Sequence, residues 1–477
     1  MNDIDTPIDY SLLAKQGMFE GIDYISRCFI PEFKRYLTSP GDYLNSRLKM
    51  SAPLWLPDRT ALVLHGLLLN GTIRGRHNKE RIDKFLRNLD ARPDAGRVPV
   101  CFAQLMRWQV WWQDKNLYLP MFLLGERCRD RITSLLSSSI PYFKAGEWLR
   151  VVALSPGLIQ IGDGNTAVNE LSLPIKEPAT ELEKEMLSFN VVAEYLTINM
   201  DEYGSYRKLV KRFGLSDSYP LVYKRPFVRI SKTQFMPIPP LIDYALTRKI
   251  DTTLASLIPD AEARGVFIRE VSKMVEEDSL SILKDLFSSS YRSPESEVSA
   301  KYGRATRPAA CDYYFEVGKW RVIGDVKWHQ AFDEFGFREN DIECWDKARF
   351  GHLFCKQIPS SMHECSIDPN IIMCVVPDYM QLWNIDMNFT PAIRAMLPSL
   401  ESLTLPLAFI SYQELRLLHE YRAINLFDEW LKLMFPKPDN YNGTAMLLQY
   451  LQRNRCFLRG EGSRQGKLAH DVLLGNL

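Results

Sequence analysis

The sequence predicts an α/β protein of the mixed (α+β) type, in which a mainly helical N-terminal region precedes a C-terminal domain built on a mixed sheet. Three observations favour this fold class. Apolar residues recur at helical spacing through much of residues 1–145. Two β-rich segments flank the turn Gly318-Lys319, and a nearly all-apolar segment at 370–376 follows a helical one. A strand–helix–strand order implies parallel strands joined by a crossover, so helices are expected to cover the sheet.

The length of the chain suggests several domains, because 477 residues correspond to about three domains of ordinary size. We expect residues 1–145 to form a mainly helical N-terminal domain and residues 146–259 a mixed α/β middle region. Residues 260–477 are expected to form a third domain with a C-terminal helical extension. The proline-rich segment 236–240 is expected to be a rigid connector, since the ring of proline fixes φ.

The composition excludes several classes of protein. Apolar residues make up 46% and charged residues 25%, which is typical of globular proteins and excludes disordered, collagen-like and coiled-coil chains. Lys and Arg number 59 against 58 Asp and Glu, so a protein that coats nucleic acid through its overall charge is excluded. No apolar stretch approaches a membrane span of about 20 residues, no signal peptide is recognisable, and nine cysteines do not suggest a disulfide framework. We expect a cytoplasmic protein without a membrane partner.

The first 259 residues show local elements but no motif with a clear chemistry. The expected elements are helices at 59–69, 78–89 and 181–195 and a strand at 227–230. Segment 101–124 contains Trp108, Trp111 and Trp112, which we interpret as helix packing rather than as a platform for stacked bases. A protein partner, or a second copy of the chain in a homodimer, is expected to bind through this N-terminal region.

From residue 260 the elements follow a regular order. They are a helix at 261–286, a short strand at 297–302, a hairpin at 311–328, a helix at 342–358, strands at 370–376 and 405–411, and a helix at 413–421. The first helix has apolar residues at positions three and four apart, the hairpin turns at Gly318-Lys319, and Pro377 ends the strand at 370–376. The order is therefore helix, three strands, helix and strand, with a further strand and helix appended.

Polar residues interrupt the apolar pattern of the hairpin. Asp325 and Lys327 lie two residues apart on its second arm, so their side chains point to the same face. Antiparallel pairing about the turn places Asp312, at the start of the first arm, near Asp325. Two converging carboxylates repel each other unless a cation lies between them, and Mg²⁺ prefers one or two carboxylates with several waters. A lysine beside the metal can orient an attacking water and offset charge developing on a phosphate.

The preceding helix contributes a further carboxylate. Glu270 lies among its apolar positions and is the best candidate for a third metal ligand or a contact to the other ligands, while Glu276 and Glu277 lie one to two turns further along the same helix. The choice among these three remains open at the level of sequence.

This constellation resembles the PD-(D/E)XK nuclease superfamily. Asp312 matches the first aspartate of its motif, and Asp325-Val326-Lys327 matches the (D/E)-x-K triplet. Cys311 departs from the pattern, because it stands where the name-giving proline would be. The resemblance covers roughly residues 260–380 and implies a restriction-endonuclease-like α-β-β-β-α-β core with a mixed sheet.

The resemblance also implies an activity. Its metal-dependent members cleave phosphodiester bonds, so we expect a nuclease that requires Mg²⁺ or Mn²⁺ and acts on nucleic acid, with DNA as the expected substrate. Asp312, Asp325 and Glu270, which corresponds to the helix glutamate of many members, would bind the metal, and Lys327 would assist catalysis. Chains that join such a domain to an unfamiliar N-terminal region resemble prokaryotic restriction and phage-defence effectors. The alternative is a non-catalytic module that binds nucleic acid or protein on a degenerate nuclease fold.

Other interpretations of the polar residues are weaker. Asp325 and Lys327 would form an ordinary ion pair on a solvated face if the second arm were exposed, but that arm is apolar on both faces. A zinc site made of Cys355, His363 and Cys365 lacks the paired cysteine spacing that such sites use. His329 is expected either to contact the scissile phosphate or to cap a strand end. Additional candidates for contact with the nucleic-acid backbone are Lys347, Arg349 and Lys356.

Overall fold

The chain divides into two compact units in a computed structural model. The described residues are 9–17, 21, 24, 62–63, 65–69, 78–90, 126–140, 173–174, 197–198, 225, 227–231, 234–237, 254–255, 258–303, 305–328, 350–376, 405–435, 447, 450–451 and 454. The first unit comprises Met1–Ile268, Asp333–Arg338 and Arg464–Leu477, and the second comprises Arg269–Phe332 and Glu339–Ser463.

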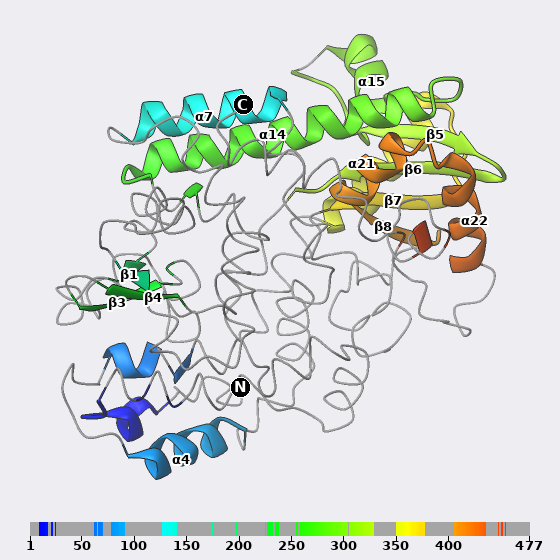
Figure 1. The fold of residues 1–477 in the computed structure, drawn as a ribbon. Coiled ribbons are helices and arrows are strands. Elements are labelled where there is room, and N and C mark those ends of the chain that lie inside the picture. Colours follow the sequence, from blue (N-terminus) through cyan, green and yellow to red (C-terminus); the bar gives the residue numbers. More distant parts are fainter. Residues whose placement is uncertain are drawn as a thin grey trace, which may run out of the picture. The chain divides into compact units, whose positions relative to one another are not determined.

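The first unit contains helices and a small sheet among its described residues. Its elements are the short 3₁₀ helix η1 (Tyr10–Leu13), helices α4 (Lys79–Asp90) and α7 (Glu126–Ser139), and strands β1 (Leu173–Pro174), β2 (Thr197–Ile198), β3 (Phe227–Ser231) and β4 (Gln234–Pro237). The strands form one sheet in the order β1-β4-β3-β2, and Figure 1 labels β1, β3 and β4. The predicted helix at 78–89 and strand at 227–230 are confirmed, whereas the predicted helix at 181–195 and the Trp-rich segment 101–124 lie outside the described residues.

The connector expected at 236–240 is wrong in its first part. Met236 and Pro237 belong to β4 and pair with Val228 and Phe227 of β3. Proline is tolerated there because Pro237 is the last residue of the strand, where one missing N–H removes little from the ladder.

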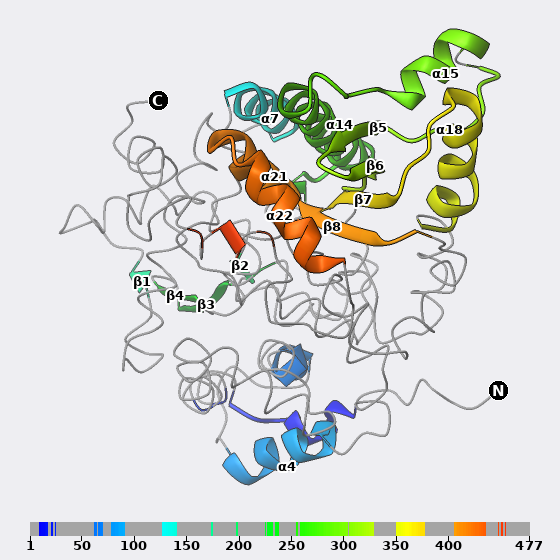
Figure 2. The same cartoon turned by 90° about the vertical axis from the view of Figure 1, so that its right-hand side faces the viewer.

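The second unit is built around a four-stranded mixed sheet. Its strands are β5 (Tyr313–Val317), β6 (Trp320–Val326), β7 (Ile371–Val376) and β8 (Leu407–Ser411). They lie in the order β5-β6-β7-β8, with an antiparallel first pair and two parallel pairs. The helices around it are α14 (Ala261–Leu286), which belongs to this unit from Arg269 onwards, α15 (Pro294–Tyr302), α18 (Ile358–Cys365), α21 (Tyr412–Glu420) and α22 (Ile424–Met434) (Figure 2). The expected mixed α/β class is therefore confirmed for this unit.

The predicted β5–β6 hairpin is also confirmed. Val317 pairs with Trp320 across a two-residue turn in which Gly318 has a φ of +56°. Gly324 lies in the middle of β6 because the neighbouring backbone leaves no room for a side chain: a Cβ there would lie 1.7 Å from the carbonyl oxygen of Met373 on β7. The absent side chain lets the central strands approach closely.

Aromatic contacts show that both faces of the sheet are covered. Phe315 of β5 stacks on Phe287, just after α14, with ring centroids 4.0 Å apart, and Phe287 also contacts Phe427 of α22. Phe409 of β8 instead contacts Phe350, at a centroid distance of 5.9 Å. Because side chains alternate along the paired strands, Phe315 and Phe409 lie on opposite faces, so α14 and α22 cover one face and the 350–365 segment the other.

The helix that crosses over between β6 and β7 ends later than predicted. It does not end at residue 358, because a π-helical turn, η8 (Leu353–Gln357), leads directly into α18. Pro359 stands where the π-helical turn passes into α18.

The expected first strand of a three-stranded meander is wrong. Residues 297–302 belong to α15, because the Ser293 hydroxyl caps the helix through the Ser296 N–H and Pro294 occupies the first turn. Among the described residues, only Arg292 pairs with the outer edge of β5, in an antiparallel bridge in which its N–H donates to the Tyr314 carbonyl at 2.8 Å. Within the described residues, the order α-β-β-β-α-β is therefore corrected to two helices, two strands, a helix and two strands.

Candidate metal centre

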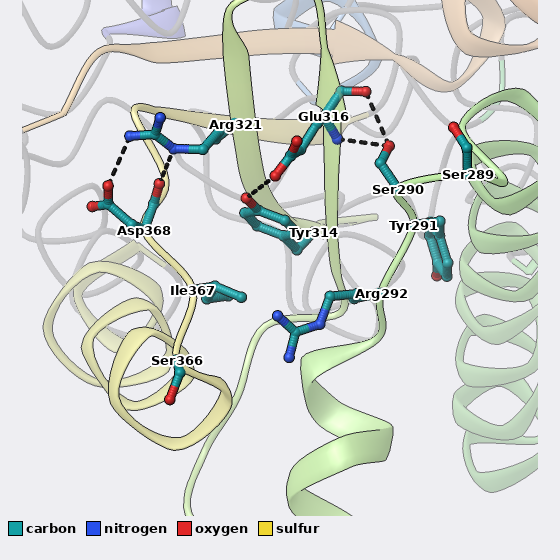
Figure 3. Close-up of a pocket in the computed structure, with 10 residues that line it drawn as sticks. All are labelled: Ser289, Ser290, Tyr291, Arg292, Tyr314, Glu316, Arg321, Ser366, Ile367 and Asp368. Carbon is teal, nitrogen blue, oxygen red and sulfur yellow. Dashed lines mark hydrogen bonds and ion pairs between the residues drawn. The ribbon is translucent and has the colours of Figure 1, made fainter.

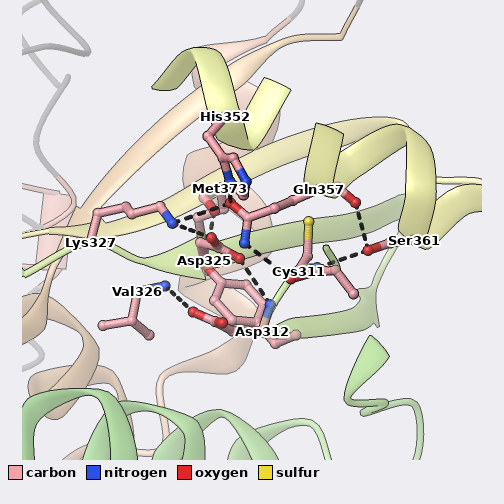
Figure 4. Close-up of polar contacts among 11 residues, drawn as sticks. Cys311, Asp312, Asp325, Val326, Lys327, His352, Gln357, Ser361 and Met373 are labelled. Carbon is pink, nitrogen blue, oxygen red and sulfur yellow. Dashed lines mark hydrogen bonds and ion pairs between the residues drawn. The ribbon is translucent and has the colours of Figure 1, made fainter. Parts of the chain in front are cut away.

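The open end of the β5–β6 hairpin brings two aspartates together. The pairing of Tyr313 with Gly324 places Asp312 opposite Asp325. The Asp312 N–H donates to Asp325 Oδ1 at 2.9 Å, and the Val326 N–H donates to Asp312 Oδ2 at 2.8 Å (Figure 4). Each aspartate is therefore fixed by the backbone of the opposite strand, in the proximity that the hairpin register predicts.

Asp325 and Lys327 form a buried ion pair. Lys327 Nζ donates to Asp325 Oδ2, and the two side chains are only 16% and 1% exposed. The pair therefore does not lie on a solvated face, as the interpretation of these two residues as an ordinary surface ion pair requires. Burying a charged pair away from water is costly, and here it occurs on the strand that carries the predicted triplet.

Two glutamates complete an acidic cluster around Asp312. Carboxylate oxygens of Glu276, Glu295 and Asp312 all lie within 4.8 Å of one another. Glu276 is on α14 and Glu295 is in the first turn of α15. Glu270 and Glu277 do not join this group. Glu270 lies six residues before Glu276, which turns its side chain about 120° around the helix axis.

Glu295 was not predicted, because it depends on a helix that was expected to be a strand. Its N–H donates to the Cys311 carbonyl at 3.0 Å, which fixes the start of α15 beside Asp312. Its carboxylate also pairs with Arg307 at 2.5 Å. The local signal that was available is Ser293-Pro294, a typical N-cap followed by proline.

The electrostatic environment of the cluster favours either protons or a cation. Burial raises the pKa of Asp312 well above its usual range, and the charge of Asp325 raises it further. Burial also raises the pKa of Glu276, together with repulsion from Glu295 and Asp325. Burial by itself would lower the pKa of Lys327, but attraction to Asp325 and Asp312 outweighs it and leaves this pKa raised.

The crossover helix contacts the same group of residues through Gln357. Its amide oxygen lies 3.4 Å from Lys327 Nζ, and its amide nitrogen donates to the Ala310 carbonyl at 3.0 Å (Figure 4). No local pattern in the sequence points to Gln357, because the contact depends on how the helix lies on the sheet.

No family model, no curated protein and no solved structure matches this chain. Its function therefore has to be inferred from the residues of this chain and from the resemblance of its motif.

The donor set of the cluster fits a hard cation. Its available ligand atoms are carboxylate oxygens, which Mg²⁺ and Mn²⁺ prefer over soft sulfur ligands. The alternative zinc ligands do not come together: within the described part of the chain, the acidic cluster is the only group with a metal-binding arrangement. Cys374 is buried in β7, and the Cys365 Sγ lies 3.8 Å from the Pro294 carbonyl oxygen.

A hollow lies towards the hairpin turn, on the sheet face that carries Tyr314 and Arg321. It has a volume of about 620 Å³ and a polar lining (Figure 3). Arg321 is paired with Asp368 at 2.8 Å, and Arg292 is paired with Glu297 at 2.6 Å. Because each arginine is neutralised by a carboxylate, this hollow has no net attraction for a phosphate.

The remaining predictions concern basic residues near the site and membrane-spanning helices. His329, Lys347 and Arg349 lie outside the described residues, while Lys356 is exposed on the π-helical turn. Among the helices that the structure describes, none has the length and apolar character needed to cross a membrane.

Proposed function

We propose that the protein is a metal-dependent nuclease that hydrolyses phosphodiester bonds through a PD-(D/E)XK-type site in its second unit. The observation that carries this proposal is the convergence, at the end of one hairpin, of Asp312 and Asp325 with the buried Lys327 and the two glutamates. A lone acidic cluster is common on protein surfaces. A buried lysine bound to one of the aspartates is much less so, and it supplies the positive charge that phosphate chemistry requires.

The proposed chemistry divides between the metal and the side chains. Asp312, Glu276 and Glu295, with Asp325 beside them, would hold Mg²⁺ or Mn²⁺, which polarises a phosphoryl oxygen and lowers the pKa of a bound water. Asp325 holds the ammonium group of Lys327 at the edge of the cluster. From there Lys327 donates hydrogen bonds to the attacking water or to the non-bridging phosphate oxygens, where negative charge develops in the transition state.

We further propose DNA as the substrate and restriction or phage defence as the biological setting. Both follow from the resemblance of the motif to nucleases of that kind. The net charge of +1 supports a protein that binds nucleic acid weakly until it is directed to a target.

Nuclease assays test the proposal directly. Purified protein is incubated with plasmid, linear and single-stranded DNA and with RNA, in Mg²⁺, Mn²⁺ or EDTA. We expect metal-dependent cleavage of DNA that Asp325→Ala and Lys327→Ala each reduce at least about a hundredfold, a loss of about 2.7 kcal/mol of transition-state stabilisation. The matched controls are Asp368→Ala and Lys319→Ala, which remove an exposed aspartate and an exposed lysine of the same unit.

Cleavage that persists in EDTA, or in both Asp325→Ala and Lys327→Ala, would contradict the proposed mechanism. Binding of nucleic acid without cleavage in any metal would instead support the alternative of a non-catalytic module. Cleavage of RNA alone would retain the mechanism and correct the substrate.

A further inference from the structure

The position of Lys327 is determined from two sides. Asp325, two residues earlier on β6, binds its ammonium group, and Gln357 approaches it from the crossover helix (Figure 4). A lysine side chain has four flexible torsions, so one contact to the neighbouring Asp325 leaves the direction of its remaining N–H groups undefined. A second acceptor on a different element restricts that direction.

The orientation of the Gln357 amide follows from its neighbours. Its nitrogen faces the Ala310 carbonyl at 3.0 Å, which can only accept a hydrogen bond, and its oxygen faces an ammonium group, which can only donate. In the flipped orientation, the amide nitrogen would face the ammonium group, which is also a donor, and the amide oxygen would face the carbonyl, which is also an acceptor. The oxygen also lies 3.3 Å from Nδ1 of His352, which must donate to it, because an amide oxygen can only accept.

The backbone around Gln357 places this amide accurately. Gln357 is the last residue of the π-helical turn, a rare geometry that is frequently found at functional sites. One turn later, Ser361 is fully buried: its hydroxyl donates to the Gln357 carbonyl and accepts from the Cys311 N–H, both at 2.8 Å. The crossover helix is therefore attached to residues 310 and 311, immediately before Asp312.

We infer that Gln357 is the positioning residue for Lys327, and that its amide holds the ammonium group in place beside Asp325. This inference rests on the proposed nuclease function. Gln357 does not contact the carboxylates of the cluster in any described hydrogen bond, so its effect passes through Lys327. Ser361 has a different role, because it links the crossover helix to Cys311 and has no described hydrogen bond to Lys327.

Kinetics of two variants separate these tasks. Gln357→Leu keeps the approximate volume but removes the acceptor, whereas Ser361→Ala weakens the attachment of the helix and leaves the amide in place. We expect Gln357→Leu to lower kcat about tenfold with little change in KM, the order expected for losing one hydrogen bond to a charged group. Ser361→Ala is expected to lower the unfolding temperature but to retain a kcat close to that of the unchanged protein. Gln357→Glu, which restores an acceptor for Lys327, is expected to recover part of the rate.

A second measurement does not depend on activity. In protein labelled with ¹⁵N-lysine, the Nζ signal of Lys327 is identified by its loss in Lys327→Arg. We expect its protons to exchange with water about tenfold faster in Gln357→Leu than in the unchanged protein or in Ser361→Ala. Unchanged exchange and unchanged kcat in Gln357→Leu, or equal effects in both variants, would overturn the inference. If the unchanged protein cleaves nothing, the proposed function fails, and the exchange measurement alone decides whether Gln357 positions Lys327.

Discussion

Two carboxyl groups at the site have raised pKa values, and this has a measurable consequence for stability. Asp312 and Glu276 bind protons more tightly in the folded protein than in the unfolded chain, because burial and neighbouring carboxylates disfavour their charged forms. The stability that this provides is complete below the unfolded pKa of about 4 and is lost as the pH rises through the folded values. A bound divalent cation would offset the same repulsion.

The first prediction concerns this pH dependence. In EDTA, the free energy of unfolding from urea titrations should fall as the pH rises above about 4, by up to about 1.4 kcal/mol per pH unit for each group. Asp312→Asn should reduce this slope, because the amide does not titrate and still accepts from the Val326 N–H. An identical slope in Asp312→Asn and in the unchanged protein would show that Asp312 is not the group responsible.

The second prediction distinguishes the glutamates of α14. Glu276→Gln should lower metal-dependent cleavage at least about a hundredfold, because it removes a carboxylate from the cluster with Asp312. Glu270→Gln is the matched control on the same helix and should stay within about threefold, a change of about 0.7 kcal/mol. Steady-state cleavage rates measure both. A large loss of cleavage in Glu270→Gln but not in Glu276→Gln would support Glu270 as the metal ligand, which is the assignment that the sequence favours.

Glu276 also shows why the sequence could not settle this choice. The apolar spacing of residues 261–286 is sufficient to predict a helix, and α14 has those bounds. Which glutamate faces Asp312 depends on the rotation of the helix against the sheet, and that rotation is set by packing such as the contact of Phe287 with Phe315. Local patterns carry no information about it.

At the scale of the elements, the β5–β6 hairpin was predictable from the sequence, whereas helix α15 was not. The turn at Gly318-Lys319 fixes the register, and the register alone brings Asp312 to Asp325. The segment after residue 292 was ambiguous because its short apolar pattern fits a strand or a helix. Ser293 caps this segment as the helix α15, and the start of that helix determines the position of Glu295.

The third prediction tests the close packing of the two central strands. Gly324→Ala should destabilise the second unit by about 3 kcal/mol or more, because its Cβ would overlap the Met373 carbonyl oxygen and force β6 and β7 apart. Gly303→Ala is the control: its φ of +77° is unfavourable for alanine, but nothing lies within 4 Å of the added Cβ. Its ψ of 157° lies in a region that essentially only glycine adopts, so we expect a cost of about 1–3 kcal/mol in urea denaturation from backbone strain alone. A cost below about 1 kcal/mol for Gly324→Ala would show that β6 and β7 can separate with little penalty.

At the scale of the whole molecule, the nearly balanced charge and the division into two units fit together. A net charge of +1 provides no general attraction to a polyanion. All residues of the candidate site that the structure describes belong to the second unit, from Glu276 on α14 to Gln357 on the crossover helix. We therefore expect metal binding to depend on the second unit, and the first unit to be free for recognition of a target or partner.

The last prediction follows from this division. Calorimetry of the full chain should show two unfolding transitions, and Mg²⁺ at about a hundredfold its dissociation constant should stabilise one of them by about 2.7 kcal/mol. Gly324→Ala identifies the transition of the second unit, because only that unit contains the β6–β7 contact. Asp312→Asn should abolish the shift while both transitions remain. A Mg²⁺ shift of the other transition, or one that survives in Asp312→Asn, would place the metal elsewhere in the chain and remove the main support for a nuclease site at this hairpin.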